Sequence, residues 1–131
     1  MNFKGLNNNG KWVEGHGIIP DGGDYDYIVN SPYVIEYQQR VRHDTVCVGS
    51  RITDANGDEV FENDIIKIAF GKDEYYYVVK YDTRCGQYYL LNSNVRFDTI
   101  NDLSAELKFH VVGNAYTDKD LLNRALSRNK D

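Results

Sequence analysis

Several features are scarce in this chain of 131 residues. It contains two prolines, two cysteines, one methionine and one tryptophan. No apolar run approaches the ~20 residues that a membrane-spanning helix needs, so we expect no transmembrane helix. The first residues form no long hydrophobic segment and therefore predict no signal peptide. With two cysteines and no export signal, a reduced, cytoplasmic protein is the default expectation.

Motifs that carry chemistry are also missing. The three histidines, His16, His43 and His110, lie far apart and show no metal-ligand spacing. The sequence has no glycine-rich phosphate loop and no Gly-x-Ser-x-Gly elbow. Cys47 lies in an apolar run and is expected to pack as a small hydrophobic residue, whereas Cys85 falls in a predicted turn. We therefore predict no catalytic residues, no metal site and no cofactor, and expect a protein that is not an enzyme.

Tyrosine, in contrast, is abundant, with 11 residues in the chain. Tyrosine and β-branched residues favour strands, and frequent glycine-containing turns favour a mainly-β class. The net charge of −5 argues mildly against a dedicated nucleic-acid binder, because such proteins are usually basic.

The chain is organised around residues 45–70, which contain two candidate strands joined by a turn. Asn56-Gly57 is the strongest short hairpin signal, because both residues tolerate positive φ and match the twist of flanking strands. In the second strand, Ile66, Ile68 and Phe70 fall on one face by their period of two.

Acidic residues surround this hairpin and invite a metal interpretation. An EF-hand loop needs glycine at its sixth position, but Gly57 is fourth when Asp54 is first. We therefore interpret Asp54 and Asn56 as turn residues. The remaining acidic side chains are expected to be solvated: Asp58, Glu59, Glu62 and Asp64.

The sequence VGSRITDANGDEVFENDIIKI, from Val48 to Ile68, resembles the core motif of the YopX family of phage and prophage proteins. The matching residues are Val48, Gly49, Asp54, Asn56, Gly57, Glu59, Phe61, Glu62, Asp64 and Ile65. Phe109–Tyr116 with Leu121-Leu122 resembles the family's ending, and Phe3 with Trp12–Gly15 resembles its opening. The resemblance implies a fold and a phage or prophage origin, but no catalytic site.

Two positions depart from the family pattern. Arg51 stands where glycine is usual, and Asn63 replaces the glycine of the family's E-G-D sequence. Glycine supplies backbone conformations that other residues rarely adopt. We therefore expect that the backbone path of both loops could differ from that of the family.

The pattern of strands predicts two parts. Residues 45–131 are expected to form a small SH3-like barrel, ending in a helix whose N-cap is Thr117. Residues 1–44 are expected to form an adjoining N-terminal β segment. In it Trp12 is expected to anchor the core, Gly15–Gly17 to loosen the chain and Pro20–Asp24 to form a loop. The spacing of Val34, Tyr37 and Val41 also suits a helix, but for Tyr33–His43 we favour a strand because its flanks are β. Thr99–Leu107 suits a brief helix or turn.

Tyrosines gather on one predicted hairpin, with a central strand at Tyr75–Tyr81 followed by a return strand. One face must fill the core. The other face includes Tyr76, Val78 and one of Tyr88 or Tyr89, so the candidate binding residues are Tyr76, Val78, Tyr88 and Tyr89. It is either exposed, which suits protein contacts or base stacking, or covered by the N-terminal segment, and we weigh these alternatives equally.

Two functions therefore compete. The favoured one is a non-enzymatic phage or prophage accessory protein that binds a host or phage protein in the host cytoplasm, or binds itself as a homo-oligomer. Tyr76 and Val78 would then lie at or near the contact. The alternative is a nucleic-acid-associated factor that uses the same hairpin with basic residues Lys67, Lys80, Arg84 and Arg96.

Overall fold

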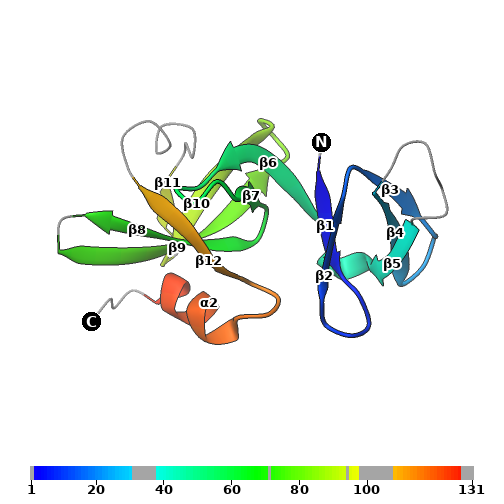
Figure 1. The fold of residues 1–131 in the computed structure, drawn as a ribbon. Helices are drawn as coiled ribbons and strands as arrows, with labels where there is room; N and C mark the ends of the chain where they lie inside the picture. Colours follow the sequence, from blue (N-terminus) through cyan, green and yellow to red (C-terminus); the bar gives the residue numbers. More distant parts are fainter. Residues whose placement is uncertain (1, 31–37, 71, 94, 98–107, 128–131) are drawn as a thin grey trace. The chain divides into compact units, whose positions relative to one another are not determined.

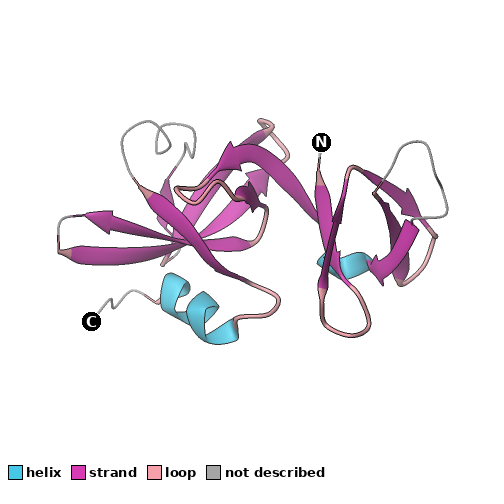
Figure 2. Ribbon diagram, in the orientation of Figure 1, coloured by secondary structure: helices cyan, strands magenta, loops and turns pink. Residues whose placement is uncertain are grey.

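The computed structural model of the protein describes residues 2–30, 38–70, 72–93, 95–97 and 108–127. Its secondary structure is mainly β, as predicted, with a short helix near the C-terminus (Figure 2). The strands are β1 (Phe3–Leu6), β2 (Trp12–Gly15), β3 (Gly17–Pro20), β4 (Tyr25–Val29), β5 (Gln38–Arg42), β6 (Cys47–Thr53), β7 (Glu59–Phe61), β8 (Asp64–Phe70), β9 (Asp73–Asp82), β10 (Gln87–Asn92), β11 (Val95–Phe97) and β12 (Phe109–Asn114). A 3-10 turn (His43–Thr45) follows β5, and the helix α2 (Lys119–Leu126) follows β12.

The strands form three antiparallel sheets (Figure 1). Their orders are β2-β1-β6-β7, β3-β4-β5 and β11-β10-β9-β8-β12. The described strands do not close into a barrel, so the predicted SH3-like barrel is not confirmed. The chain divides within β6 into two compact units, Met1–Arg51 and Ile52–Asp131. The sequence had suggested a division after residue 44.

Unit 1 has a small core in which Val13, Ile28 and Val41 are buried. Gly15 lies so close to β4 that a Cβ atom there would be 2.5 Å from the carbonyl oxygen of Val29. Only glycine allows this approach of the two strands. Trp12 was predicted to anchor this core, but it is half-buried outside it, with the Lys4 ammonium 4.7 Å from its ring centroid.

Unit 2 is built on the five-stranded sheet with β9 at its centre, as expected for the most tyrosine-rich strand. One face of this sheet carries the larger core, where Ile66, Tyr77 and Leu90 are buried together. The predicted alternation of Ile66 and Ile68 on one face is confirmed. Ile65, one residue away, lies on the opposite face, as the two-residue period of a strand requires.

The opposite face of the sheet is covered by α2, which lies along it (Figure 1). Ala125 of the helix packs against Ile65 and Val78, and all three are fully buried. The helix was expected near Thr117, with that residue as N-cap. It begins at Lys119 instead, and Asp118 holds the N-cap position, so the predicted cap is wrong.

The two departures from the family pattern keep a glycine-like backbone. Arg51 has φ 68° and Asn63 has φ 70°, both in the left-handed region. The backbone conformation that glycine usually provides is thus retained with side chains present. Gly57 in the predicted Asn-Gly turn has φ 86°, which confirms the hairpin signal.

Two predicted elements cannot be compared in full. Strand β5 confirms the extended structure expected for the second half of Tyr33–His43, whereas residues 31–37 lie outside the described residues. The turn or helix predicted at Thr99–Leu107 also lies outside them.

Candidate functional site

The residues that define the family resemblance hold the fold of unit 2. Asp54 accepts the backbone N–H groups of Asn56 and Asp58 with Oδ1, each at 2.9 Å. Its Oδ2 accepts the N–H of Val111 at 2.9 Å. The neighbouring Ala55 N–H donates to the Phe109 carbonyl at 2.9 Å. The turn therefore occupies backbone groups along one edge of β12.

A second motif carboxylate is buried. Asp64 was expected to be solvated, but it is 1% exposed, so that interpretation is wrong. Its Oδ2 accepts the Phe61 N–H at 2.8 Å, and its Oδ1 accepts the Asn114 side-chain amide at 3.0 Å. Asn114 in turn accepts the Tyr116 N–H at 2.9 Å. Because these groups satisfy each other inside the protein, they serve the structure and leave no site for a ligand.

The four candidate binding residues do not form one exposed surface. Val78 is fully buried under α2, so it cannot contact a partner. Tyr76 is half-buried beside it, and the Arg124 guanidinium lies 5.0 Å from its ring centroid. From the sequence, this face of the hairpin was expected to be either exposed or covered by the N-terminal segment. The helix covers this end of the face instead.

Tyr88 and Tyr89 point to opposite faces of the hairpin, and Tyr88 packs against the larger core. Tyr88 pairs with Tyr81 across β9 and β10, and their ring centroids are 4.9 Å apart with a tilt of 59°. Tyr81 is 39% exposed, which is unusual for a large side chain in this chain. On the other face the Arg96 guanidinium covers Tyr89, 4.1 Å from the ring centroid.

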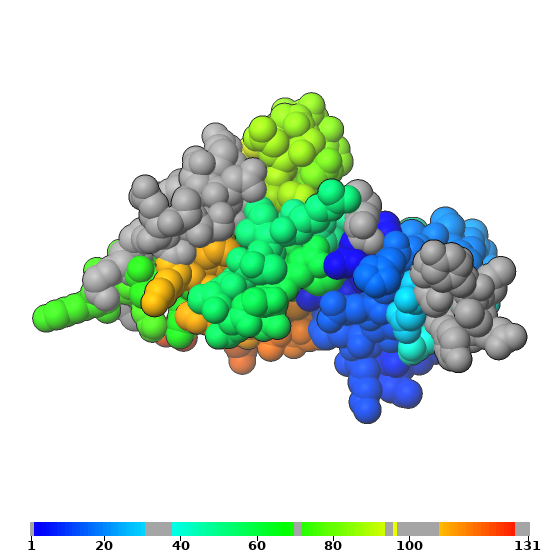
Figure 3. All heavy atoms as spheres, turned by 45° about the horizontal axis from the view of Figure 1, so that its top comes forward, coloured from blue at the N-terminus to red at the C-terminus, as the bar shows by residue number. Residues whose placement is uncertain are grey.

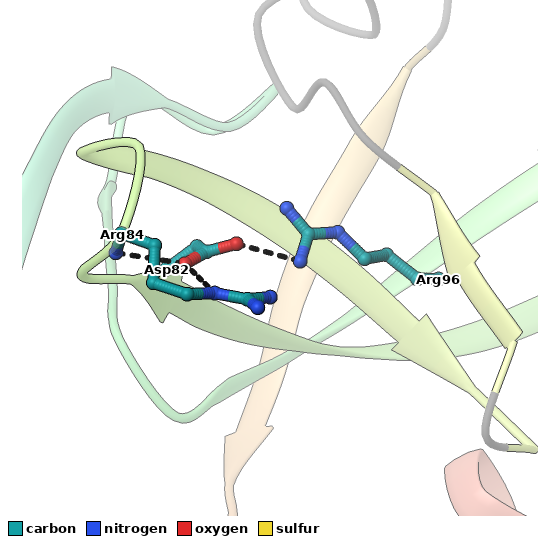
Figure 4. A network of polar contacts seen from close by, with 3 residues as sticks. All are labelled: Asp82, Arg84 and Arg96. Carbon is teal, nitrogen blue, oxygen red and sulfur yellow. Dashed lines mark hydrogen bonds and ion pairs between the residues drawn. The ribbon is translucent and has the colours of Figure 1, made fainter.

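Asp82 joins the arginines at the end of this hairpin (Figure 4). Its Oδ2 accepts from Arg96 Nη1 at 2.7 Å, and its Oδ1 accepts the Arg84 N–H at 2.9 Å. Arg84 Nε lies 3.5 Å from the same Oδ1. The hydrogen bond from Arg96, followed by that from the Arg84 backbone, holds the pKa of the Asp82 carboxyl well below its usual range.

The other basic residues considered for nucleic-acid binding have local partners. Lys67 Nζ lies 3.3 Å from Glu74 Oε2, and Lys80 Nζ donates to Asn63 Oδ1 at 2.8 Å. Arg84 differs because its side chain is 86% exposed. Of the four predicted cations, its side chain is the most exposed, whereas those of Lys67 and Arg96 are 34% and 35% exposed.

The turn between β9 and β10 projects from unit 2, as the yellow-green spheres in Figure 3 show. The hairpin surface comprises Tyr81 and Tyr88 on one face of the hairpin, Tyr89 and Arg96 on the other face, and Arg84 in the turn. Sequence reasoning found Tyr88 and Tyr89 but missed the Tyr81–Tyr88 pair and the role of Asp82. The register of the hairpin, Tyr88 opposite Tyr81, could have indicated the pair.

Unit 1 has a pocket with a volume of about 320 Å³. It is lined by Gly23, Asp24, Tyr25, Arg42, His43 and Asp44. Here His43 Nδ1 donates to Oδ2 of the buried Asp26 at 2.6 Å. An imidazole oriented by a carboxylate is a frequent part of catalytic sites. Among the described residues that line the pocket there is no serine, threonine or cysteine, so these residues provide no nucleophile for the pair. The sequence had suggested no role for His43.

The described residues contain neither a cluster of metal ligands nor a membrane-spanning helix. No group of three or more histidine, cysteine, aspartate or glutamate side chains among them could hold a metal ion. None of the helices in the same ranges is both long and apolar enough to cross a membrane. Cys47 is buried, as expected for a residue in an apolar run, and Cys85 is exposed in the turn between β9 and β10.

The fold defines a small, mainly-β protein whose motif residues tie one hairpin to a helix-covered sheet. The model of the YopX protein family matches residues 8–123, which is most of the chain. The chain therefore belongs to the YopX family, as the resemblance indicated. Comparisons with curated proteins and with solved structures find no match.

Proposed function

We propose that this YopX-family chain is a non-enzymatic accessory protein of a phage or prophage, and that it binds a partner protein in the host cytoplasm. Family membership supports the phage setting. The observation that carries the proposal is the hairpin surface, where Tyr81 and Arg84 stand exposed on a projecting turn.

Tyrosine and arginine support a protein-binding role for physical reasons. Both are enriched at protein interfaces and at their hot spots, because each combines a large contact area with directional hydrogen bonding. The Tyr81–Tyr88 ring contact holds both aromatic side chains in place before binding. A surface that is ordered in advance loses less conformational entropy when a partner docks.

The alternative of nucleic-acid binding has weaker support. A nucleic-acid binder neutralises several phosphates with basic side chains. Here Lys67 and Arg96 contact carboxylates, and Lys80 is bound to the Asn63 side chain. With a chain charge of −5, the two exposed arginines of the hairpin, Arg84 and Arg96, provide little attraction for a polyanion.

The experiment is affinity capture from phage-infected host lysate with the wild-type chain and two matched variants. Tyr81→Ala removes an exposed aromatic ring from the hairpin surface. Ile19→Ala removes a side chain of similar exposure, 41% against 39%, from β3 in unit 1. We expect a discrete captured protein that is lost with Tyr81→Ala and kept with Ile19→Ala.

Other outcomes would contradict the proposal. Capture that survives Tyr81→Ala would place the contact elsewhere on the chain. Light scattering on the purified protein tests whether the partner is a second copy, as predicted from the exposed tyrosines. Because Tyr76 is held under α2, Tyr81→Glu is the better variant for this test than Tyr76→Glu, and it should reduce the measured mass of an oligomer.

A further inference from the structure

The hairpin surface differs in charge from the rest of the chain. Residues 80–97 carry three basic side chains, Lys80, Arg84 and Arg96, against the single carboxylate of Asp82, for a net charge of +2. The whole chain carries −5, so the remaining residues carry −7. The segment from the end of β9 to β11 is thus locally positive in an acidic protein.

Arg84 is held in an orientation suited to binding a carboxylate. Its backbone N–H and its side-chain Nε both contact Asp82 Oδ1, at 2.9 and 3.5 Å. The two terminal nitrogens lie beyond Nε, at the end of the side chain (Figure 4). Arginine can bind a carboxylate with these two terminal nitrogens as a planar fork. Asp82 therefore engages one side of the guanidinium and leaves its end for another group.

The aromatic pair lies on the face of the hairpin opposite the Asp82 carboxylate, close to the same turn. Tyr81 precedes the turn, and its hydroxyl oxygen would be 3.5 Å from a Cβ atom placed at Gly86. Its ring thus runs alongside the turn that carries Arg84. The surface combines the exposed guanidinium end of Arg84 in the turn with the exposed ring of Tyr81 on one face, and both border the tip of the hairpin.

We infer that the occupant of the hairpin surface is an acidic polypeptide segment of the partner protein, in which a glutamate or aspartate binds the terminal nitrogens of Arg84 and an apolar or aromatic neighbour packs on Tyr81 and Tyr88. This inference rests on the proposed function and names the chemistry of its partner. A single fork fits one carboxylate, whereas a nucleic acid requires a row of cations along its backbone. Asp82 acts as a positioning residue for Arg84.

The test is fluorescence anisotropy with the full chain and three labelled probes. The first is a peptide of alternating glutamate and tyrosine, the second has glutamine in place of glutamate, and the third is an oligothymidylate of the same charge as the first. We expect the acidic peptide to bind at least about tenfold more tightly than the glutamine peptide, because a charge-assisted fork is lost in the latter.

Variants of Arg84 distinguish a contact between its two terminal nitrogens and a carboxylate from general charge attraction. Arg84→Glu should weaken binding of the acidic peptide by at least about tenfold, and Arg84→Lys by about fivefold, because lysine keeps the charge but not the fork. Lys11→Glu makes the same charge change at an exposed residue of unit 1 and should alter the Kd by less than about twofold.

Asp82→Asn provides a test in which the two explanations predict opposite signs. It makes the surface more positive by one charge, so general attraction would strengthen binding of the acidic peptide. If Asp82 positions Arg84, the same variant should weaken binding by about threefold. A strengthened affinity would contradict the positioning role.

Three results would overturn the inference. They are no binding of the acidic peptide, equal losses with Lys11→Glu and Arg84→Glu, and tighter binding of the oligothymidylate than of the peptide. The lysate capture distinguishes this failure from failure of the proposed function. A partner that is lost with Tyr81→Ala but kept with Arg84→Glu would leave protein binding in place and remove the acidic segment.

Discussion

The side-chain amide of Asn114 donates to the carboxylate of Asp64 at 3.0 Å, across 50 positions in the sequence, and both residues are buried. Asp64 begins β8 and Asn114 ends β12, so this contact fastens the ends of two paired strands. Asp118, just before α2, also binds Asn114, because its Oδ2 accepts the Asn114 backbone N–H at 2.9 Å. Asp64, Asn114 and Asp118 thus form a polar network that joins β8, β12 and the start of α2.

Asn114→Ala tests how much this polar network contributes to the stability of the protein. The variant leaves the Asp64 carboxylate without the amide donor and removes the acceptor of the Tyr116 N–H. Because loss of one partner leaves buried polar groups unsatisfied, we expect unfolding free energy to fall by about 2–3 kcal/mol. Urea unfolding followed by circular dichroism measures it. Asn9→Ala, at an exposed turn residue, should change it by less than about 0.5 kcal/mol.

Asn63 tests how the chain tolerates a side chain where the family has glycine. Asn63→Ala should cost about 1–2 kcal/mol, because it loses the Lys80 hydrogen bond and keeps the left-handed backbone. Asn63→Gly loses the same bond but removes the strain, so its stability should lie between Asn63→Ala and the wild type. Thermal unfolding gives the order. A glycine variant less stable than the alanine variant would show that backbone strain matters little at this position.

Local sequence signals predicted much of this fold for reasons that the structure explains. The Asn56-Gly57 turn was predictable because it depends only on the backbone preferences of these two residues. The alternation of side chains in β8 and β9 was predictable because every second residue packs on the same core. Strand β3 was missed because it is short: its four residues begin at Gly17 and end at Pro20. Its pairing with β4 comes from tertiary structure that no short-range pattern reveals.

The candidate site was less predictable because it depends on distant contacts. Tyr76 and Val78 looked free to bind since nothing near them in the sequence indicated that α2, some 40 positions later, would cover them. The burial of Asp64 was missed for the same reason, because its partner Asn114 lies at the far end of unit 2. Charge alone marked Arg84 and Arg96, but not the carboxylate that holds both.

Asp82 predicts how unit 2 responds to acid. Arg96 lowers the pKa of Asp82 in the folded protein below its value of about 3.8 in the unfolded chain. A lowered folded-state pKa means that the carboxylate stabilises the fold above this pH, and that its contribution is lost as the pH falls through the folded-state value. We expect Asp82→Asn to be less stable than the wild type at neutral pH. The difference should shrink below about pH 4 in urea titrations.

The matched control for this pH dependence is Asp58→Asn, at an exposed carboxylate of the β6–β7 turn. It should leave the shape of the stability curve against pH nearly unchanged. A difference between Asp82→Asn and the wild type that stays constant down to the lowest pH would contradict the assigned role of the carboxylate charge.

Asp26 and His43 should matter for the stability of unit 1. Asp26 is 3% exposed, and the imidazole Nδ1 donates to it at 2.6 Å. His43→Ala removes this donor from a buried carboxylate, so unfolding free energy should fall by about 1–3 kcal/mol. His43→Gln keeps a donor and should lose less. Trp12 is half-buried in the same unit, so its fluorescence in a urea titration reports the change.

His16→Ala is the control for His43, because His16 is an exposed histidine of the same unit and its Nδ1 contacts Asn2 Oδ1 at 2.7 Å. An exposed hydrogen bond is readily replaced by water, so its loss should cost less than about 0.5 kcal/mol. The double variant Asp26→Asn with His43→Ala completes the cycle. Its loss should be smaller than the sum of the two single losses, because removing the charge removes the need for the histidine. Additive losses would show that the two side chains stabilise unit 1 independently, in which case the 2.6 Å contact contributes little to the fold.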